Sequence, residues 1–343
     1  MADITHVAAD AVAYGGVIRE DVMDKIWDIS NIPLPLTELC SKGTHTNKRV
    51  EFVTDELAAP ATNNAAIEGA DISQSDGKFG ARLGNFTQIA VKEVVITDTA
   101  EAANSIGGQA SLSYQVKERQ KELRRDVEAQ MLTHQASVAG DASAAASISA
   151  GIGAQLETNV EVGSGGSAGG FNTSTGVFDA PTPGTKRALS ETLIRDVLQD
   201  IYQAGGNTAC VMARPVVIRA LSKFLLTSGA SIATLTSEKR QEAGHTPLTA
   251  YGSVNTFVTD FGQTIIMKDN RLQAVDATAT SSMYFLDPTH LRQSFLRGYT
   301  VEPLAKTGLS DKRLMSVQYS LLVLNEKSQG AILAIDEALA VTA

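Results

Sequence analysis

Histidine and cysteine are the side chains most able to bind a metal ion or to act as base or nucleophile, and their spacing here supports neither role. The five histidines are scattered along the chain: His6, His45, His134, His245 and His290. They form no HExxH motif or other paired ligand spacing, and no serine stands in a GxSxG turn. Cys40 and Cys210 lie far apart without a CxxC pair, so the sequence predicts no disulfide framework, no metal site and a reduced, cytosolic environment.

Glycine-containing segments could cradle a phosphate, but none has the required pattern. The run GSGGSAGG from Gly163 has Ala168 in place of the third glycine of a dinucleotide fingerprint, and no helical pattern follows it. Gly77–Lys78 lacks the upstream glycine and the following Ser or Thr of a P-loop. The sequence therefore predicts no catalytic constellation and no cofactor.

Composition and charge limit the class of protein further. The 343 residues are 43% hydrophobic, 20% charged and only 5% aromatic, which suits about two packed units with loop excursions. A net charge of -9 argues against a surface built to bind phosphate. It is compatible with a container that does not stick to enclosed DNA, but a charge that only keeps the protein soluble is the better explanation. Without a signal-peptide pattern or a long uncharged apolar run, neither export nor a membrane anchor is predicted.

The most informative segment, 79–135, joins a β-patterned run to a charged helix. The run 88–97 (QIAVKEVVIT) and the earlier stretch 48–56 are rich in β-branched residues and predict two arms of an excursion. The chain between the arms is polar and small, so we expect its tip to have no core of its own and to become ordered only against a neighbour.

A helix is predicted over 110–135, with one apolar stripe and two charged columns. The stripe consists of Leu112, Val116, Leu123, Val127 and Met131. The expected charge pairs on the polar side are Glu118–Lys121, Glu122–Arg125 and Arg124–Glu128. Such columns suit docking between subunits, and an ordinary solvated helix face explains them as well.

The flanking segments differ sharply in pattern. Residues 1–45 combine a helix-compatible stretch at 18–29 with IPLPLTEL, where we expect Pro33 and Pro35 to prevent a helix. The segment 138–186 is so rich in Gly, Ala and Ser that we expect a loop or flap unable to fill a core.

A compact α/β unit is predicted from residue 187 onward. Ser190 is placed to cap a helix that ends at Gly205–Gly206, a buried strand follows at 209–213, and a second helix covers 216–226. The closing third has strand patterning at 253–260, 263–268, 282–286, 291–302 and 313–325, with a short apolar stretch, GAILAID, near the end.

Several motifs in order carry a resemblance to a known family. They are RLGNFTQI, a helix containing KELRRDVE, RALSETLIRDVLQDIYQAGGN, FLDPTHLRQSFLRGYTVEPLAKTG and LLVLNEKSQGAI. In this order, over about 80–340, they resemble the major capsid proteins of tailed phages, in the short-tailed-phage branch of major head proteins. The resemblance implies the α+β Hong Kong-type capsid fold, which herpesvirus shells and bacterial encapsulins share.

Carried over, the resemblance implies six parts. They are an N-terminal arm at 1–45, an extended β-hairpin loop at 46–98, the spine helix of a peripheral domain at 99–137, a flexible Gly/Ala/Ser-rich insertion at 138–186, an axial domain at 187–279, and peripheral return strands with the C-terminus at 280–343. Since no long charged coiled-coil leader is present, the resemblance implies a separate scaffolding protein or a chain that is already processed.

The implied function is structural, not enzymatic. The resemblance implies hexamers and pentamers of this chain, assembled in the host cytoplasm into an icosahedral head that encloses double-stranded DNA without sequence-specific binding. It also implies portal and decoration proteins as partners, no cofactor and no membrane. Two alternatives stay open: an encapsulin-like compartment that carries enzyme cargo, and a small-molecule enzyme built on the α/β unit at 187–275.

Particular side chains are expected at the contacts between subunits. The candidate ion-pair partners are Arg82, Lys92, Arg119, Arg124 and Arg125. In some members of the family, an isopeptide bond between a hairpin lysine and an asparagine cross-links the subunits of the shell. The candidates for such a bond here are Lys78 and Asn325. A solvated loop lysine is the alternative interpretation of Lys78.

Overall fold

The computed structural model describes residues 32–63, 65, 67–69, 71, 79–103, 108, 110–141, 144–227, 256–274 and 280–338. The chain divides into two compact units, which are considered separately. Of the described residues, the first unit takes those within Lys92–Lys121 and Val301–Met315, and the second unit takes the rest. The helix expected at 18–29 and the candidate Lys78 lie outside the described residues.

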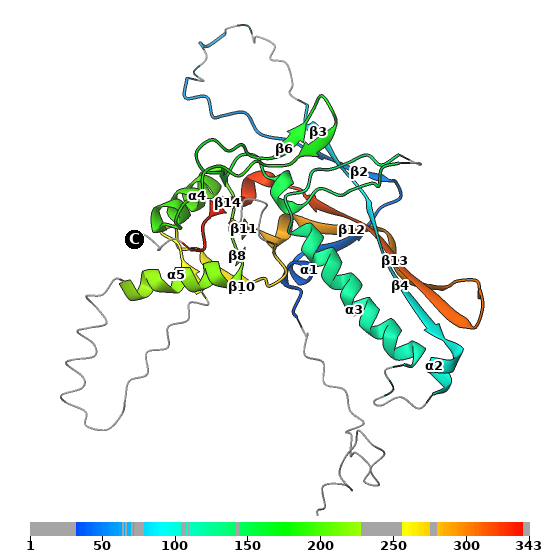
Figure 1. Ribbon diagram of the computed structural model, residues 1–343. Coiled ribbons are helices and arrows are strands. Elements are labelled where there is room, and N and C mark those ends of the chain that lie inside the picture. Colours follow the sequence, from blue (N-terminus) through cyan, green and yellow to red (C-terminus); the bar gives the residue numbers. More distant parts are fainter. Residues whose placement is uncertain are drawn as a thin grey trace, which may run out of the picture. The chain divides into compact units, whose positions relative to one another are not determined.

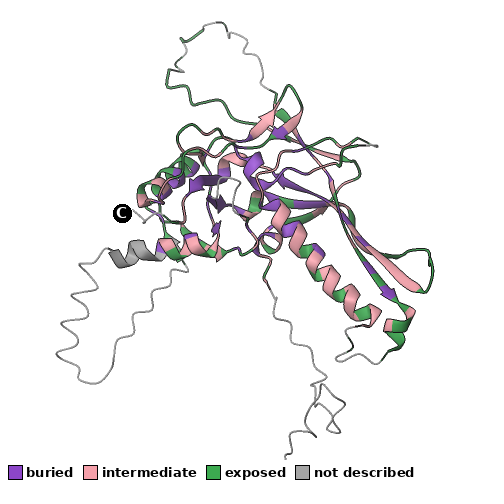
Figure 2. Ribbon diagram, viewed as in Figure 1, coloured by how far each residue is buried: buried purple, intermediate pink, exposed green. Residues whose placement is uncertain are grey.

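The second unit contains a six-stranded sheet. Its order is β5 (Val160–Glu161), β14 (Gly330–Ile335), β11 (Ser281–Leu286), β8 (Cys210–Ala213), β10 (Thr264–Asp269) and β9 (Thr256–Val258). Strand β8 runs parallel to β10 and antiparallel to β11. Figure 2 shows β8, β11 and β14 as buried strands, and every residue in them is buried. These runs are continuously apolar or small because both faces of the sheet are covered.

The two predicted helices are confirmed, and they cover one face of this sheet. Helices α4 (Glu191–Gln203) and α5 (Pro215–Thr227) share one core cluster with alternate residues of the strands (Figure 1). Ser190 caps α4 by accepting a hydrogen bond from the Leu193 N–H at 3.2 Å. Gly205, with φ at +83°, ends the helix in a left-handed conformation that favours glycine.

A hairpin and a second sheet use the other β-patterned runs. Strand β2 (Arg49–Thr54) pairs antiparallel with β3 (Ala81–Phe86) along their full lengths. The four-stranded sheet has the order β1 (Ser41–Thr44), β12 (Leu291–Pro303), β13 (Ser310–Val323) and β4 (Gln88–Thr97). The predicted strand at 88–97 is confirmed, but it lies in this sheet, and the shorter β3 forms the second arm of the hairpin.

In the first unit, the short helix α2 follows directly after strand β4. The Thr97 hydroxyl caps helix α2 (Asp98–Ala102) by accepting from the Ala100 N–H at 3.3 Å. The Asp98 N–H donates to the Leu309 carbonyl at 3.1 Å, and the Lys306 ammonium lies 2.8 Å from the Asp98 carboxylate. Both side chains of this ion pair are exposed to water, which screens their attraction, so the pair contributes little to stability.

The charged helix is confirmed as α3 (Leu112–Met131). Leu123, Val127 and Met131 of the predicted stripe are buried, whereas Leu112 and Val116 are only partly buried. The expectation that the prolines prevent a helix is wrong at one of them. Helix α1 (Pro35–Leu39) begins at Pro35 itself, because the first position of a helix needs no N–H donor and tolerates the fixed φ of proline.

The expectation that the Gly/Ala/Ser-rich segment cannot fill a core is also wrong. The turn η4 (Ile152–Gln155) is completely buried, and Ala150, Ala154 and Phe178 form a core cluster. A Cβ atom on Gly151 would lie 2.0 Å from the Thr133 carbonyl oxygen, so small residues are needed for this close approach. A two-stranded ribbon of β6 (Gly170–Asn172) and β7 (Val177–Asp179) completes the segment.

The predicted grouping of the last strands needs a correction. Strands β11 and β14, expected among the peripheral return strands, lie in the six-stranded sheet with β8 and β10, while β12 and β13 lie in the four-stranded sheet. The boundary placed at 279/280 therefore cuts through one sheet, because strands that are neighbours in space come from distant parts of the chain. Within the described residues, no helix is long and apolar enough to cross a membrane.

Candidate assembly surfaces

Large apolar side chains are exposed on the hairpin and on the chain that extends beyond it. Leu57 is 95% exposed and Phe79 is 97% exposed, just past the last paired residues of β2 and β3; Val53 and Ile67 are exposed too. The tip was predicted to be polar and made of small residues, and these exposed apolar side chains are exceptions to that prediction. Full burial of one such side chain is worth about 1.5–3 kcal/mol, so this exposed set is a surface suited to contact with another protein.

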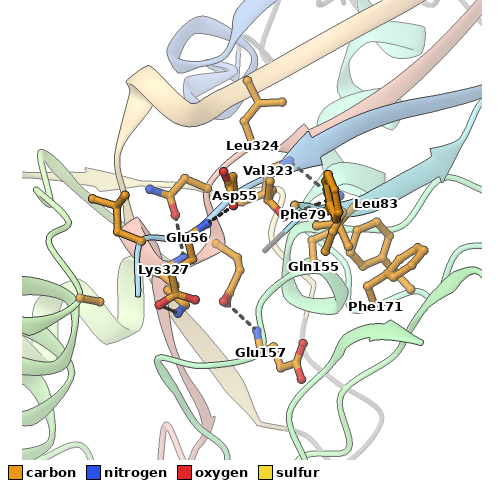
Figure 3. Close-up of a pocket in the computed structure, with 18 of the residues that line it drawn as sticks. Asp55, Glu56, Phe79, Leu83, Gln155, Glu157, Phe171, Val323, Leu324 and Lys327 are labelled. Carbon is orange, nitrogen blue, oxygen red and sulfur yellow. Dashed lines mark hydrogen bonds and ion pairs between the residues drawn. The ribbon is translucent and has the colours of Figure 1, made fainter. Parts of the chain in front are cut away.

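A hollow of about 730 Å³ lies beside the base of the hairpin (Figure 3). Its apolar lining includes Phe79 and Leu83 from the hairpin and Phe171 from the ribbon β6–β7. Figure 3 shows Glu56 and Lys327 at its opposite side, where the Lys327 ammonium lies 2.6 Å from the Glu56 carboxylate. The hollow thus combines an apolar lining with a charged margin, which is the composition of a protein contact.

Asn325, one of the two cross-link candidates, contributes to this hollow. It is exposed and caps the short turn η6 (Glu326–Ser328), with its side-chain oxygen accepting from the Lys327 N–H at 3.1 Å. The neighbouring Glu326 carboxylate accepts from the Thr158 N–H at 3.2 Å. Asn325 therefore lies at the surface on a turn that hydrogen bonds hold in place, and a side chain of another molecule can reach it.

The five candidate contact cations come from several elements. Arg82 on β3 is exposed and pairs with Glu51 on β2 of the same hairpin. Lys92 is half-buried on β4, and Arg119 and Arg125 are half-buried on α3. Arg124 is exposed, with its guanidinium 5.4 Å from the centre of the Tyr299 ring. Three of the five candidate cations lie on α3, whereas Arg82 and Lys92 lie on two different strands.

Of the charge pairs expected on α3, one is confirmed and one is wrong. The Lys121 ammonium lies 2.9 Å from the Glu118 carboxylate. The expected Arg124–Glu128 pair is wrong, because Glu128 is completely buried. Its carboxylate accepts hydrogen bonds from the Leu36 and Thr37 N–H groups, both at 2.7 Å. The i, i+4 charge pattern does not indicate this role. The position of Glu128, three residues before Met131 on the buried stripe, could have indicated it.

The buried carboxylate influences nearby titrating groups. Burial raises the pKa of the Cys40 thiol to about 12, and the negative charge of Glu128 adds to the rise. Burial raises the pKa of Tyr299 as well, with Arg124 opposing the shift and Glu128 adding to it. The Cys40 thiol and the Tyr299 hydroxyl therefore stay neutral near pH 7.

No arrangement for catalysis is found in the part of the chain that the structure describes. His134 Nε2 lies 2.9 Å from the Ser282 hydroxyl, but Ser282 is only 2% exposed and a substrate could not reach it. Among the same residues, no group of three or more His, Cys, Asp or Glu side chains could hold a metal ion.

Comparison with solved structures defines the class of protein to which this fold belongs. A chain from Mycobacterium phage Cain matches with a TM-score of 0.55 at 10% identity, over 98% of this chain and 99% of that one. A capsid chain of cyanophage P-SCSP1u has a TM-score of 0.53 at 12% identity, over 95% and 93%. The SrpI encapsulin of Synechococcus elongatus has a TM-score of 0.54 at 10% identity, over 94% and 95%. The fold is therefore the Hong Kong-type fold of phage capsids and encapsulins.

Comparison of sequences then gives the family. The family model described as SU10 major capsid protein matches residues 4–336, so the chain belongs to the SU10 major capsid protein family. The major capsid protein of Escherichia phage Phieco32 is 26% identical over 325 residues, which cover 87% of this chain and 89% of that protein. The chain is accordingly a structural capsid protein of a tailed phage, and the resemblance stated from the ordered motifs is confirmed.

Proposed function

We propose that this chain self-assembles as pentamers and hexamers into the icosahedral head that encloses the double-stranded DNA of its phage. The observation that carries this proposal is the hairpin β2–β3, which ends in exposed apolar side chains such as Leu57 and Phe79. Lapped over a neighbouring copy, such a hairpin buries surface that one subunit leaves exposed. Closed symmetry then repeats this contact many times, so individually weak contacts give a stable shell.

The parts of the chain take the roles that the family fold implies. We assign the arm to 1–45, the hairpin loop to 46–98 and the spine helix to 99–137. The axial role falls to the six-stranded sheet with α4 and α5, which combines the predicted axial segment 187–279 with β11 and β14. A separate scaffolding protein, a portal and decoration proteins complete the head, which is assembled in the host cytoplasm without a cofactor, an enzymatic step or a membrane.

Ion pairs between subunits involve the five predicted cations, Arg82, Lys92, Arg119, Arg124 and Arg125. The exposure of the Arg124 side chain on α3 supports a contact there. A covalent cross-link between two copies would join the Lys78 Nζ to the side-chain carbonyl carbon of Asn325, breaking the C–N bond of the side-chain amide and releasing ammonia. Denaturing gels of mature particles decide whether it forms. A ladder of cross-linked bands supports the bond, whereas monomeric bands exclude it.

Electron microscopy of the full chain, expressed with and without its phage's scaffolding protein, tests the assembly proposal. Closed shells of uniform size with the scaffold are the expected result. Uniform soluble dimers under both conditions contradict it. An encapsulin-like compartment is the second candidate, since the SrpI encapsulin shares the fold. Particles from infected cells distinguish the two, because a phage head contains DNA and a compartment contains protein cargo.

A further inference from the structure

Helix α1 lacks a cap from its own segment. It begins at Pro35, and the residue before it, Leu34, makes no side-chain capping hydrogen bond. The first N–H groups of a helix have no partner within the helix and need one elsewhere. Whatever satisfies these N–H groups therefore also fixes the position of α1.

The Glu128 carboxylate supplies the missing cap from the middle of α3. Its Oε1 accepts from the Leu36 N–H at 2.7 Å, and its Oε2 accepts from the Thr37 N–H at 2.7 Å and from the Thr37 hydroxyl. Both oxygens are therefore engaged with two successive residues of α1. Hydrogen bonds to a charged acceptor are stronger and more directional than those between neutral groups.

A third element holds the same carboxylate from another direction. The Asn270 side-chain amide donates to Glu128 Oε1 at 2.9 Å. Asn270 is completely buried at the end of β10, where its backbone N–H donates to the Ala213 carbonyl of β8 at 3.0 Å and its side-chain oxygen accepts from the Leu272 N–H at 2.9 Å. The asparagine is thus fixed by the six-stranded sheet, and Glu128 connects that sheet with α1.

We propose that Glu128 is a positioning residue for assembly, which holds α1, a part of the arm assigned to 1–45, against α3 while Asn270 at the end of β10 fixes the carboxylate. The proposal rests on the proposed function and adds that this arm contacts neighbouring copies. An apolar side chain would continue the stripe of Leu123, Val127 and Met131 without burying a charge. The carboxylate gives orientation instead, because a movement of α1 away from Glu128 would leave buried polar groups without hydrogen-bond partners, which is costly.

Hydrogen–deuterium exchange on the full chain tests the local part of the proposal. Glu128→Gln keeps the size of the side chain and removes the charge and one acceptor oxygen. We expect exchange in the peptide that covers 33–41 to rise at least tenfold in the variant. Leu123→Ala is the matched control, since it removes a buried side chain from the same face of α3 and touches none of these hydrogen bonds. It should loosen α3 while it leaves exchange at 33–41 near the wild-type rate.

Shell formation with the scaffold tests the assembly part. Glu128→Gln should give few or misassembled shells, whereas Leu123→Ala should give normal shells at a temperature where it is folded. If Glu128→Gln does not fold, Thr37→Val, which removes only the hydroxyl donor, should still speed exchange at 33–41 and reduce shell yield.

The possible failures are distinct. Unchanged exchange at 33–41 in both Glu128→Gln and Thr37→Val overturns the inference, and so does faster exchange with normal shells. Equal acceleration in Leu123→Ala also overturns it, because the effect is then general loosening. Absence of shells from the wild-type chain counts against the proposed function instead.

Discussion

Two phenylalanines that line the same hollow should respond in opposite ways to truncation. Phe79 is 97% exposed, whereas Phe178 is 3% exposed and belongs to the core cluster with Ala150 and Ala154. The Phe178 ring also meets the Phe171 ring edge to face, with centroids 5.2 Å apart. Replacing each by alanine shows which side chain stabilises the subunit, expected for Phe178, and which one is available to contact a neighbouring copy, expected for Phe79.

The magnitudes follow from the two exposures. Phe178→Ala removes a buried ring and leaves a cavity, which should destabilise the subunit by about 3–5 kcal/mol. Phe79→Ala removes a ring already in water, so the free energy of unfolding should change by less than about 0.5 kcal/mol. In a shell, burial of Phe79 against a neighbour would contribute up to about 3 kcal/mol per contact, and the loss is repeated in every subunit.

Equilibrium urea unfolding of the unassembled subunit and shell yield by sedimentation measure the two effects. Phe79→Ala should keep the unfolding midpoint of the wild type and lose most of its shells. Phe178→Ala should lower the midpoint strongly. The reasoning is refuted if Phe79→Ala destabilises the subunit as much as Phe178→Ala does, or if it assembles with wild-type yield.

Three further outcomes follow. Ser190→Ala should lower the free energy of unfolding by about 1 kcal/mol in urea titrations, since it removes the cap of α4, and an unchanged midpoint would count against the cap. Burial raises the pKa of Cys40 to about 12 and that of Cys210 to about 11, above the ordinary 9.0. Both thiols should therefore resist a thiol reagent at pH 8 until the protein is denatured, and rapid labelling of the native protein would contradict this. The free energy of unfolding should hold below pH 9 and fall as the pH rises toward 11–12, because the unfolded chain loses these protons first. Arg124→Glu combined with Arg125→Glu should change subunit stability by less than about 1 kcal/mol and reduce shell yield; unchanged assembly and particle stability would show that these arginines are not contacts.

Local patterns predicted much of the second unit. The capped helix α4, the strand β8 and the helix α5 appear where the sequence placed them, because their signals are local: Ser190 at one end, Gly205 at the other, and an apolar stripe between. The strands β10 and β13 were also found from alternation and β-branched residues. Their partners were not predicted, since pairing between distant strands leaves no local signal.

Side chains that act through distant partners could not be predicted from local patterns. Glu128 was expected in a surface ion pair, yet its partners lie in α1 and after β10. The small residues around Gly151 were interpreted as a flap, although their lack of bulk permits close packing against the Thr133 backbone. Leu57 and Phe79 could have been noticed as isolated large apolar residues in a polar stretch, but only the structure shows that they remain exposed.

A cryo-electron microscopy reconstruction of assembled shells would show whether the β2–β3 hairpin lies between copies. We expect closed icosahedral shells in which Leu57 and Phe79 lie within about 4.5 Å of apolar side chains of a neighbouring copy. A shell in which these two side chains project into solvent would contradict it.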